Sequence, residues 1–534
     1  MQYLLNILLS LSLLTSAYAA TAEDWRKRSI YQIITDRYAL PQGADLNACD
    51  PAKQTFCGGT WNTIKDNLDY IQNAGFTAIW ISPVSQNYQG PRTPYGDPYH
   101  GYWIADASKL NDRFGTADDL KALSDELHSR GMYLMVDVVV NNVMALSTKP
   151  DLSTYMFKQE SQYHPYCPID WGNTTSEQNC WLGDLNVTLP DVNTQDPTVV
   201  SAYSAWIKAL VQEFNIDGLR IDGKFVRMAT IHTAPSHFDL IVRHFPYAAA
   251  KHVDMQFWPQ FCGAAGVYCI GEVFDADAGQ ALQWQGKQAL DAILNYPAYN
   301  ALVSAFAIPG AQNMSALTDM IAQVKQKSSD PTLLGNFLED QDVPRWASIS
   351  VDPQSLWNAM TFNWMSDGIP ILYYGQEQGF NGNADPLRNH LINATDDWLT
   401  SQVQVLSSTQ EAIAFMKGNV VTVLTNVGSP PANVTIAART PFSNSLSTTD
   451  ILTCTQFAIG SNGSVEVEYS KGGRPVILVP DDLLDNSGLC GHEAPQPVSG
   501  KSQQGAVATS GASGRSGPMA FAAGLAALVL ALAL

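Results

Sequence analysis

Short apolar runs alternate with amphipathic segments along most of the chain. The runs SIYQII from Ser29, FTAIWIS from Phe76 and MYLMVDVVV from Met132 are continuous and rich in Val, Ile and Leu, which is typical of parallel strands buried on both faces. Between such runs lie segments with helical spacing, such as TADDLKALSDELHSRG from Thr116. Eight strands that alternate with helices predict a closed (β/α)₈ barrel, an α/β fold. The remaining five runs begin at Ile216, Val267, Ala292, Leu333 and Ile369.

The spacing of these runs also predicts how the chain divides into domains. The barrel comprises residues 21–140 and 195–403, and residues 141–194 form an insertion after the third strand. A connection of that length normally has a function. Residues 404–491 contain short alternating strands broken by Gly, Pro, Ser and Asn, a pattern that predicts an antiparallel β-sandwich.

Both ends of the chain have the composition of processing signals. Residues 1–20 form an apolar stretch that closes with Ala17, Tyr18 and Ala19, as a cleavable secretory signal does. Residues 492–518 are a stalk rich in Pro, Ser and Gly, and residues 519–534 are an apolar tail. Small residues, a polar spacer and a terminal apolar tail indicate a GPI anchor. The tail is short for a spanning helix, which needs roughly 20 apolar residues, so a transmembrane anchor is the weaker alternative.

Cysteines and glycosylation sequons agree with an extracellular protein. The number of cysteines is eight, an even number, which favours disulfides in a secreted chain. Proximity suggests pairing, although the sequence leaves the connectivity open. The six Asn-x-Ser/Thr sequons favour the same compartment. The suggested pairs are Cys49 with Cys57, Cys167 with Cys180, Cys262 with Cys269, and Cys454 with Cys490.

The negative net charge of the chain disfavours some classes of binding partner. The formal net charge is −20, from 30 basic and 50 acidic residues. Such a charge argues against a nucleic acid or an anionic membrane surface as a partner. A neutral polymer fits better, and the expected membrane contact is through the lipid anchor alone. We expect a monomer.

Polar residues that close four of the predicted strands are candidates for chemistry, because the active sites of such barrels lie at the carboxyl ends of the strands. An ionisable group there costs several kcal/mol to bury unless it is paired or in use. One such residue is more often part of a structural ion pair, but four strands converging on one rim favour a functional site. The four segments are Asp137 to Asn141, Arg220 to Asp222, Gly271 to Phe274 and Glu339 to Asp342.

These four segments resemble the four signature regions of the α-amylase family of glycoside hydrolases. The similarity extends through YGDPYHGYW from Tyr95, CWLGDLNVTLPDVNT from Cys180 and GIPILYYGQEQG from Gly368. It covers nearly the whole mature chain and is closest to the fungal secreted enzymes. The substrate class that it implies is an α-1,4-glucan or maltooligosaccharide.

The resemblance implies roles for individual residues. It makes Asp222 the nucleophile, Glu272 the general acid/base and Asp342 the third carboxylate, as a retaining double displacement requires. We expect Arg220, two residues before the nucleophile, to keep it ionised. By the same resemblance, Tyr102 forms a stacking platform under the reacting sugar, to which His100 hydrogen-bonds.

A structural calcium ion is also implied. The family supplies oxygen ligands at positions that match Asn141 and Asp191 in this chain. A third ligand, Glu in the family, falls on Gln178, whose amide oxygen still coordinates but with less charge. Hard oxygen donors of this kind suit Ca²⁺.

The departures from the family lie around the predicted active site. Asn142 and Gln341 stand where the family has His, Asp340 replaces an Asn, and Phe225 with Val226 replaces a Lys-His pair. The three carboxylates are all present. An apolar face at Phe225 is expected to favour a sugar acceptor over water.

The departures and the predicted anchor together suggest the function. They resemble a fungal subgroup of GPI-anchored, wall-associated 4-α-glucanotransferases, so we predict transfer on α-1,4-glucan. A hydrolytic α-amylase is the alternative, and a non-catalytic glucan-binding wall protein is the third.

Overall fold

The structure is a computed structural model. The predicted signal peptide up to Ala19, most of the stalk and the apolar tail lie outside the described part of the chain. Within that part, no helix combines the length and the apolar character needed to cross a bilayer. The described residues are 20–45, 49, 53–222, 248–249, 252–308, 313–350, 352–379, 396–429, 434–443, 446–469, 473–485 and 487–492.

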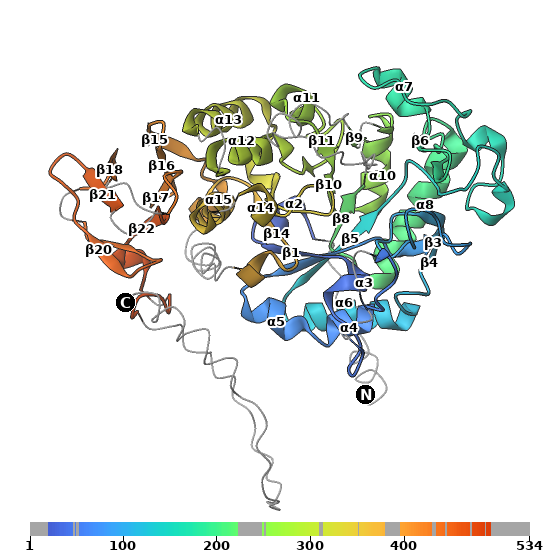
Figure 1. The fold of residues 1–534 in the computed structure, drawn as a ribbon, viewed down its shortest axis with the longest axis horizontal. Coiled ribbons are helices and arrows are strands. Elements are labelled where there is room, and N and C mark those ends of the chain that lie inside the picture. The colour runs from blue at the N-terminus through green and yellow to red at the C-terminus, as the bar shows by residue number, and fades with distance from the viewer. Residues whose placement is uncertain are drawn as a thin grey trace, which may run out of the picture. The chain divides into compact units, whose positions relative to one another are not determined.

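Eight parallel strands form the central barrel (Figure 1), which confirms the predicted fold. The strands follow one another around the sheet in the order β12-β10-β8-β5-β2-β1-β14-β13. A single parallel bridge between Leu294 and Gly335 joins the two ends of this order and closes the cylinder. The bounds are β1 Ile30–Ile33, β2 Ala78–Ile81, β5 Tyr133–Val138, β8 Gly218–Ile221, β10 Tyr268–Gly271, β12 Ala292–Ile293, β13 Gly335–Asn336 and β14 Ile369–Tyr373.

Helices surround the barrel and bury their apolar faces against it. In α8, Asp196 caps the first turn, Pro197 occupies the first position and Asn215 ends the helix in the left-handed conformation, as expected for these residue types. Thr116 and Asp119 form a capping box at the start of α6. The helices are α2 Ala22–Trp25, α3 Thr35–Tyr38, α4 Trp61–Lys65, α5 Leu68–Asn73, α6 Ala117–Ser129, α8 Pro197–Phe214, α10 Phe257–Ala265, α11 Ala278–Leu282, α12 Tyr296–Phe306, α13 Met314–Lys327, α14 Trp346–Ile349, α15 Pro353–Met365 and α17 Asp396–Thr400.

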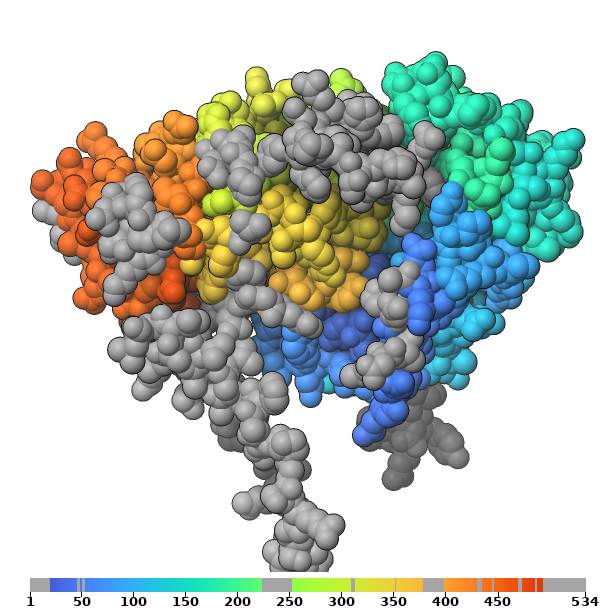
Figure 2. Space-filling model, viewed as in Figure 1, coloured from blue at the N-terminus to red at the C-terminus, as the bar shows by residue number. Residues whose placement is uncertain are grey.

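The insertion after β5 has little regular structure of its own. An antiparallel contact between Asn142 and Asp191 joins its two ends. Figure 2 shows the insertion and the coloured residues of the C-terminal region on different sides of the barrel. A β-ribbon of β3 Ser85–Asn87 and β4 Ile104–Leu110 lies in the connection between β2 and α6. The short elements of the insertion are η3 Leu152–Thr154, η4 Glu160–Gln162, α7 Thr174–Asn179, β6 Leu182–Gly183 and β7 Thr188–Leu189.

The C-terminal region is antiparallel, as predicted. One sheet has the strand order β15-β16-β17-β22-β19-β20, and β18 pairs with β21 in a second sheet. Val423 and Leu478 from the first sheet pack in one core with Ile436 and Val467 from the second. The strands are β15 Gln404–Ser408, β16 Ala412–Lys417, β17 Val420–Thr425, β18 Val434–Arg439, β19 Thr448–Asp450, β20 Thr455–Phe457, β21 Ser464–Tyr469 and β22 Val476–Pro480.

Three of the four suggested cysteine pairs are disulfides: Cys49–Cys57, Cys167–Cys180 and Cys454–Cys490. The suggested bond between Cys262 and Cys269 is wrong in this structure, because both are free thiols. Cys262 lies on α10 and Cys269 on the neighbouring β10, and the two thiols are joined by a hydrogen bond instead. Burial and this hydrogen bond raise the pKa of the Cys269 thiol.

A buried ion pair connects the C-terminal sheet to the barrel. Lys417 on β16 is 3% exposed, and its Nζ donates to Asp367 Oδ1 at 2.5 Å and to the Ser401 carbonyl at 2.7 Å. We predict that Lys417→Met lowers the free energy of unfolding by about 3 kcal/mol, because the largely buried Asp367 carboxylate loses its cation. Chemical denaturation measures the change.

The matched control is the exposed pair of Lys121 with Asp125. Lys121→Met is expected to cost less than about 1 kcal/mol. Equal losses in the two variants would contradict the assignment of a stabilising role to the buried pair.

Candidate active site

Adjacent strands bring the predicted catalytic residues together at the carboxyl end of the barrel. Asp137 on β5 is in register with Arg220 on β8, and Arg220 is in register with Ile270 on β10. Asp222 directly follows β8, and Glu272 directly follows β10. The strand register therefore sets the acidic side chains around the Arg220 guanidinium.

Arg220 is fully buried and contacts three carboxylates. Its Nη1 donates to Asp222 Oδ1 at 2.7 Å and to both oxygens of Asp137 at 2.9 and 3.0 Å. Its Nη2 donates to Glu272 Oε2 at 2.5 Å. One guanidinium thus spans Asp222 and Glu272, so these two carboxyl groups face each other across a gap that one side chain bridges.

Asp137 is held by neutral donors as well. Trp80 Nε1 donates to its Oδ2 at 3.0 Å, and the Tyr102 hydroxyl donates to the same oxygen at 2.8 Å. The guanidinium carbon of Arg220 also lies 5.0 Å from the ring centroid of Trp80. These contacts fix the position of Arg220, so that the carboxylates around it are positioned in turn.

Burial dominates the proton equilibria of this cluster. It raises the pKa of Asp222 to about 7, and the negative charges of Asp137 and Asp342 add to the rise while Arg220 opposes it. Burial likewise raises the pKa of Asp137 to about 6. The expectation that Arg220 keeps Asp222 ionised is therefore only half right, because one cation is shared among three acids in a largely buried site.

Tyr296 connects Glu272 to the fourth signature segment. Its hydroxyl lies 2.9 Å from both Glu272 Oε1 and Asp340 Oδ2. A hydroxyl has one proton, so it satisfies both oxygens only when one of the two carboxyls is itself protonated. Asp340 Oδ1 accepts the backbone N–H groups of Asp342 and Val343 at 2.6 and 2.8 Å, which favours ionised Asp340. Glu272 in turn accepts from Arg220 Nη2, so each of the two carboxyls has donors of its own besides the shared Tyr296 hydroxyl.

Asp342 is held through its neighbour Gln341. Gln341 Nε2 donates to Asp342 Oδ2 at 3.0 Å, and Gln341 Oε1 accepts from Gln32 Nε2 at 2.6 Å. Both Asp342 and Gln341 are half-buried, whereas Gln32 on β1 is 1% exposed. The Asp342 carboxylate is thus partly exposed, and Gln341, itself held by the buried Gln32, orients it.

His100 lies beside Tyr102 near these acids. Its Nδ1 accepts the Tyr102 N–H at 3.0 Å, and the two rings are stacked with centroids 5.9 Å apart. Burial and the positive charge of Arg37 lower the pKa of His100 to about 4, against the influence of Asp342. The imidazole is therefore neutral near neutral pH and offers Nε2 as its remaining polar atom.

The residues expected to bind calcium show a mixed pattern. Neither side-chain polar atom of the buried Asn141 has a hydrogen-bond partner among the residues that the structure describes. Asp191, buried as well, is kept next to it, because Val192 N–H donates to the Asn141 carbonyl at 2.8 Å. Asp191 Oδ2 contacts His164 Nδ1 at 2.6 Å. Gln178 is half-buried on α7, so the unpartnered amide of Asn141 and the Asp191 carboxylate are the two donors that best fit a hard cation.

The other predicted substrate residues are less informative. Asn142 is buried and is bridged to Asp191 at the base of the insertion. Phe225 and Val226 lie outside the described residues, so the prediction of an apolar acceptor face stays a prediction.

Sequence reasoning missed Tyr296, Gln32 and His252. Tyr296 and Gln32 gave no signal in the sequence, because an isolated Tyr or Gln beside an apolar run looks structural. His252 did give a signal, since it belongs to the single Lys-His dipeptide of the chain, Lys251-His252. It follows β9 Ala248–Ala249, which pairs with β11 Val273–Phe274 directly after Glu272. Its Nδ1 lies 2.6 Å from the Glu177 carbonyl oxygen in the insertion.

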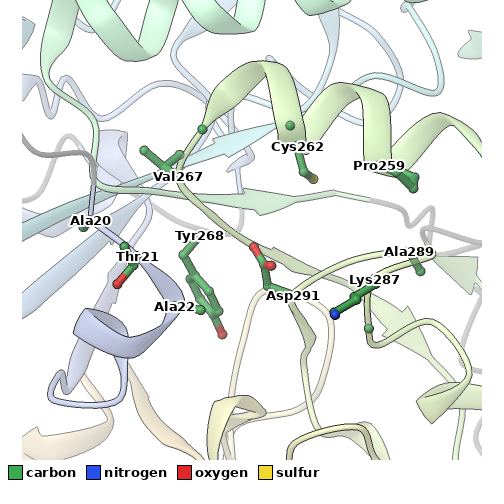
Figure 3. Close-up of a pocket in the computed structure, with 13 residues that line it drawn as sticks. Ala20, Thr21, Ala22, Pro259, Cys262, Val267, Tyr268, Lys287, Ala289 and Asp291 are labelled. Carbon is green, nitrogen blue, oxygen red and sulfur yellow. The ribbon is translucent and has the colours of Figure 1, made fainter.

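A pocket of about 330 Å³ lies away from this site. Figure 3 shows Cys262, Tyr268, Lys287 and Asp291 around it. Tyr268 begins β10 and Glu272 follows its end, so this pocket is at the amino end of the strands. We place the chemistry at the carboxyl end, where the acids converge.

Known families and proteins match most of the chain. Residues 32–417 match the model of the α-amylase catalytic domain, and residues 405–497 match α-amylase domain C. The chain is 42% identical over 510 residues to α-amylase 1 of Lipomyces kononenkoae, covering 89% of this chain and 77% of that protein. It is 38% identical over 509 residues to α-amylase 2 of Schwanniomyces occidentalis, covering 89% and 94%.

A solved structure gives the same result. The α-amylase from Malbranchea cinnamomea superposes with a TM-score of 0.79 at 37% identity, over 88% of this chain and 100% of that one. The chain therefore belongs to the α-amylase family of glycoside hydrolases.

Proposed function

We propose that this α-amylase-family enzyme is a 4-α-glucanotransferase that acts on α-1,4-glucan at the cell wall. Its retaining chemistry is supported above all by one observation, the contact of a single Arg220 guanidinium with both Asp222 and Glu272. Two carboxyls that follow adjacent strands and contact the same guanidinium suit covalent capture of a sugar.

The proposed reaction has two steps. In the first, the Asp222 carboxylate attacks the anomeric carbon, the glycosidic C–O bond breaks, and Glu272 gives its proton to the departing oxygen. In the second, the hydroxyl of an acceptor sugar gives its proton to Glu272 and attacks the same carbon, which releases Asp222. The Tyr296 hydroxyl hydrogen-bonds Glu272 and Asp340 and so orients the acid that the first step needs.

The second step decides between transfer and hydrolysis. Gln341 and Asn142 replace two histidines of the family pattern, and the loss of one hydrogen bond to a transition-state oxygen costs on the order of 3 kcal/mol. Such losses slow the reaction with water, whereas a sugar acceptor adds binding energy of its own. Hydrolysis is the second candidate, favoured by fungal relatives that are named α-amylases.

An extracellular location is part of the proposal. Three disulfides are formed, which is typical of oxidising compartments. The sequon asparagines Asn173, Asn186, Asn313 and Asn462 are all exposed. The secretory signal and the GPI anchor that complete this proposal are predictions from the sequence.

A calcium ion is proposed as a structural cofactor. Asn141 and Asp191 would hold it, with Gln178 as a further oxygen donor from the insertion. The ion would tie the insertion to the end of β5 and neutralise the buried Asp191 carboxylate, whose pKa burial raises well above its usual value.

The length of the products tests the proposed transfer. We predict that the purified ectodomain converts maltoheptaose into both longer and shorter chains, and that Asp222→Asn abolishes both by removing the nucleophile. Mass spectrometry of the products measures the chain lengths. Shorter products alone would show hydrolysis, and full activity of the Asp222 variant would refute the mechanism.

The pH profile tests the electrostatics of the nucleophile. Because the pKa of Asp222 is raised to about 7, the attacking carboxylate is lost as the pH falls through that value, and kcat/KM falls with it. Asp137→Asn removes a negative neighbour, so the acid limb of the profile is predicted to move to lower pH.

A matched control is Asp106→Asn on β4, a buried aspartate paired with Lys109. It is expected to leave the limb in place. An Asp137 variant with an unmoved acid limb would contradict the assigned coupling.

Removal of divalent cations tests the calcium site. We expect a chelator to lower the melting temperature of the wild-type enzyme and added Ca²⁺ to restore it, because an ion bound to the folded state stabilises it. Asn141→Leu is expected to unfold at the same temperature with and without Ca²⁺, as followed by circular dichroism. The proposed calcium site would be refuted if neither the chelator nor added Ca²⁺ changed the melting temperature of the wild-type enzyme.

A further inference from the structure

Gln32 is a buried amide in a strand that is otherwise apolar. It lies on β1 between Tyr31 and Ile33, and it is 1% exposed. Burying an amide without hydrogen bonds is costly, so its contacts carry information. Its Nε2 donates to Gln341 Oε1 at 2.6 Å, whereas its own Oε1 has no partner in the described part of the chain. Within that part, the contact with Gln341 is therefore the one side-chain hydrogen bond that compensates the burial of Gln32.

This contact determines which end of the Gln341 amide faces Asp342. The amide has a donor end and an acceptor end that are alike in shape. With Gln341 Oε1 occupied by the Gln32 N–H, Gln341 Nε2 is directed at Asp342 Oδ2, 3.0 Å away. The reversed orientation would set two N–H groups against each other and a carbonyl oxygen against a carboxylate.

We infer that Gln32 is a positioning residue, which fixes the Gln341 amide with its N–H toward Asp342 and so holds that carboxylate in place to grip the reacting sugar. The inference rests on the proposed role of Asp342 in glycosyl transfer. The chain has two glutamines in series at this point, where the family has a histidine next to the acid. An imidazole offers an N–H from either ring nitrogen through its choice of tautomer, but a glutamine amide needs a partner to select its orientation.

The loss of the Gln32 contact is expected to affect the side chain of Asp342 and not its backbone. β1 and β13 each pair with β14, and Asp342 follows β13. Asp342 N–H is held separately by Asp340 Oδ1 at 2.6 Å. The backbone of Asp342 is thus fixed without Gln32, and the side-chain orientation is what depends on it.

Substitution at Gln32 tests the inference. Gln32→Met keeps the length of the side chain and removes the donor. Because Asp342 acts on hydroxyls in the transition state, we expect kcat to fall by about tenfold with KM little changed. The kcat of the Gln32→Glu variant is expected to fall further. A carboxylate only accepts hydrogen bonds, so it draws the Gln341 N–H away from Asp342. The assay follows total loss of maltoheptaose, so transfer and hydrolysis both count.

Two comparisons separate positioning from plain structural support. Gln285→Met removes another buried glutamine, which donates to the Asp330 carbonyl at 2.7 Å away from the site, and is expected to leave kcat unchanged. In a Gln341→His background, which needs no oriented amide, Gln32→Met is expected to change kcat by less than about twofold.

Two results would overturn the inference. One is a kcat of the Gln32→Met variant equal to that of the wild-type enzyme. The other is a tenfold loss of kcat when Gln32→Met is added to Gln341→His. Turnover that yields only hydrolysis products would refute the proposed transfer and leave the Gln32 comparison valid. Absence of any turnover in the wild-type enzyme would overturn both.

Discussion

The arrangement of the active site depends on one buried cation shared among three carboxylates. Arg220 has no exposed surface, and Asp137, Asp222 and Glu272 all contact its guanidinium. Its planar fork of donors suits this arrangement in a way that a lysine would not. The acids outnumber the cation, and burial raises the pKa of Asp222 to about 7 and that of Asp137 to about 6. A retaining glycosidase needs one ionised and one protonated carboxyl.

Neutral side chains also hold the acids of the site. Asp137 accepts from Tyr102 and Trp80. Glu272 accepts from Tyr296, and Asp342 accepts from Gln341. Neutral donors orient carboxylates without adding charges that would need compensation in a buried site. The chemistry therefore depends on hydroxyl, indole and amide groups as much as on the acids themselves.

Much of this could be predicted from the sequence because it is local. The apolar runs predicted all eight barrel strands. The structure brings three of the acids near their ends, Asp137, Asp222 and Glu272, into contact with one guanidinium. Tyr296 and Gln32 could not be predicted, because their importance arises from contacts with residues 24 and 309 positions away. The suggested Cys262–Cys269 bond was wrong, since proximity in sequence does not distinguish two thiols in contact from a bond. The raised pKa of Asp222 depends on the extent of burial, which no short motif encodes.

The closure of the barrel has a consequence for the catalytic acids. β12 and β13 have two residues each, and the one β-bridge between these two neighbours among the described residues joins Leu294, which follows β12, to Gly335. Glu272 lies on one side of this seam, and Asp340 and Asp342 lie on the other. The Tyr296 hydroxyl reaches across and touches Glu272 and Asp340. The Tyr296 hydroxyl therefore links acids on the two sides of this seam, and the backbone hydrogen bond from Asn295 N–H to the Gly335 carbonyl at 2.8 Å crosses it as well.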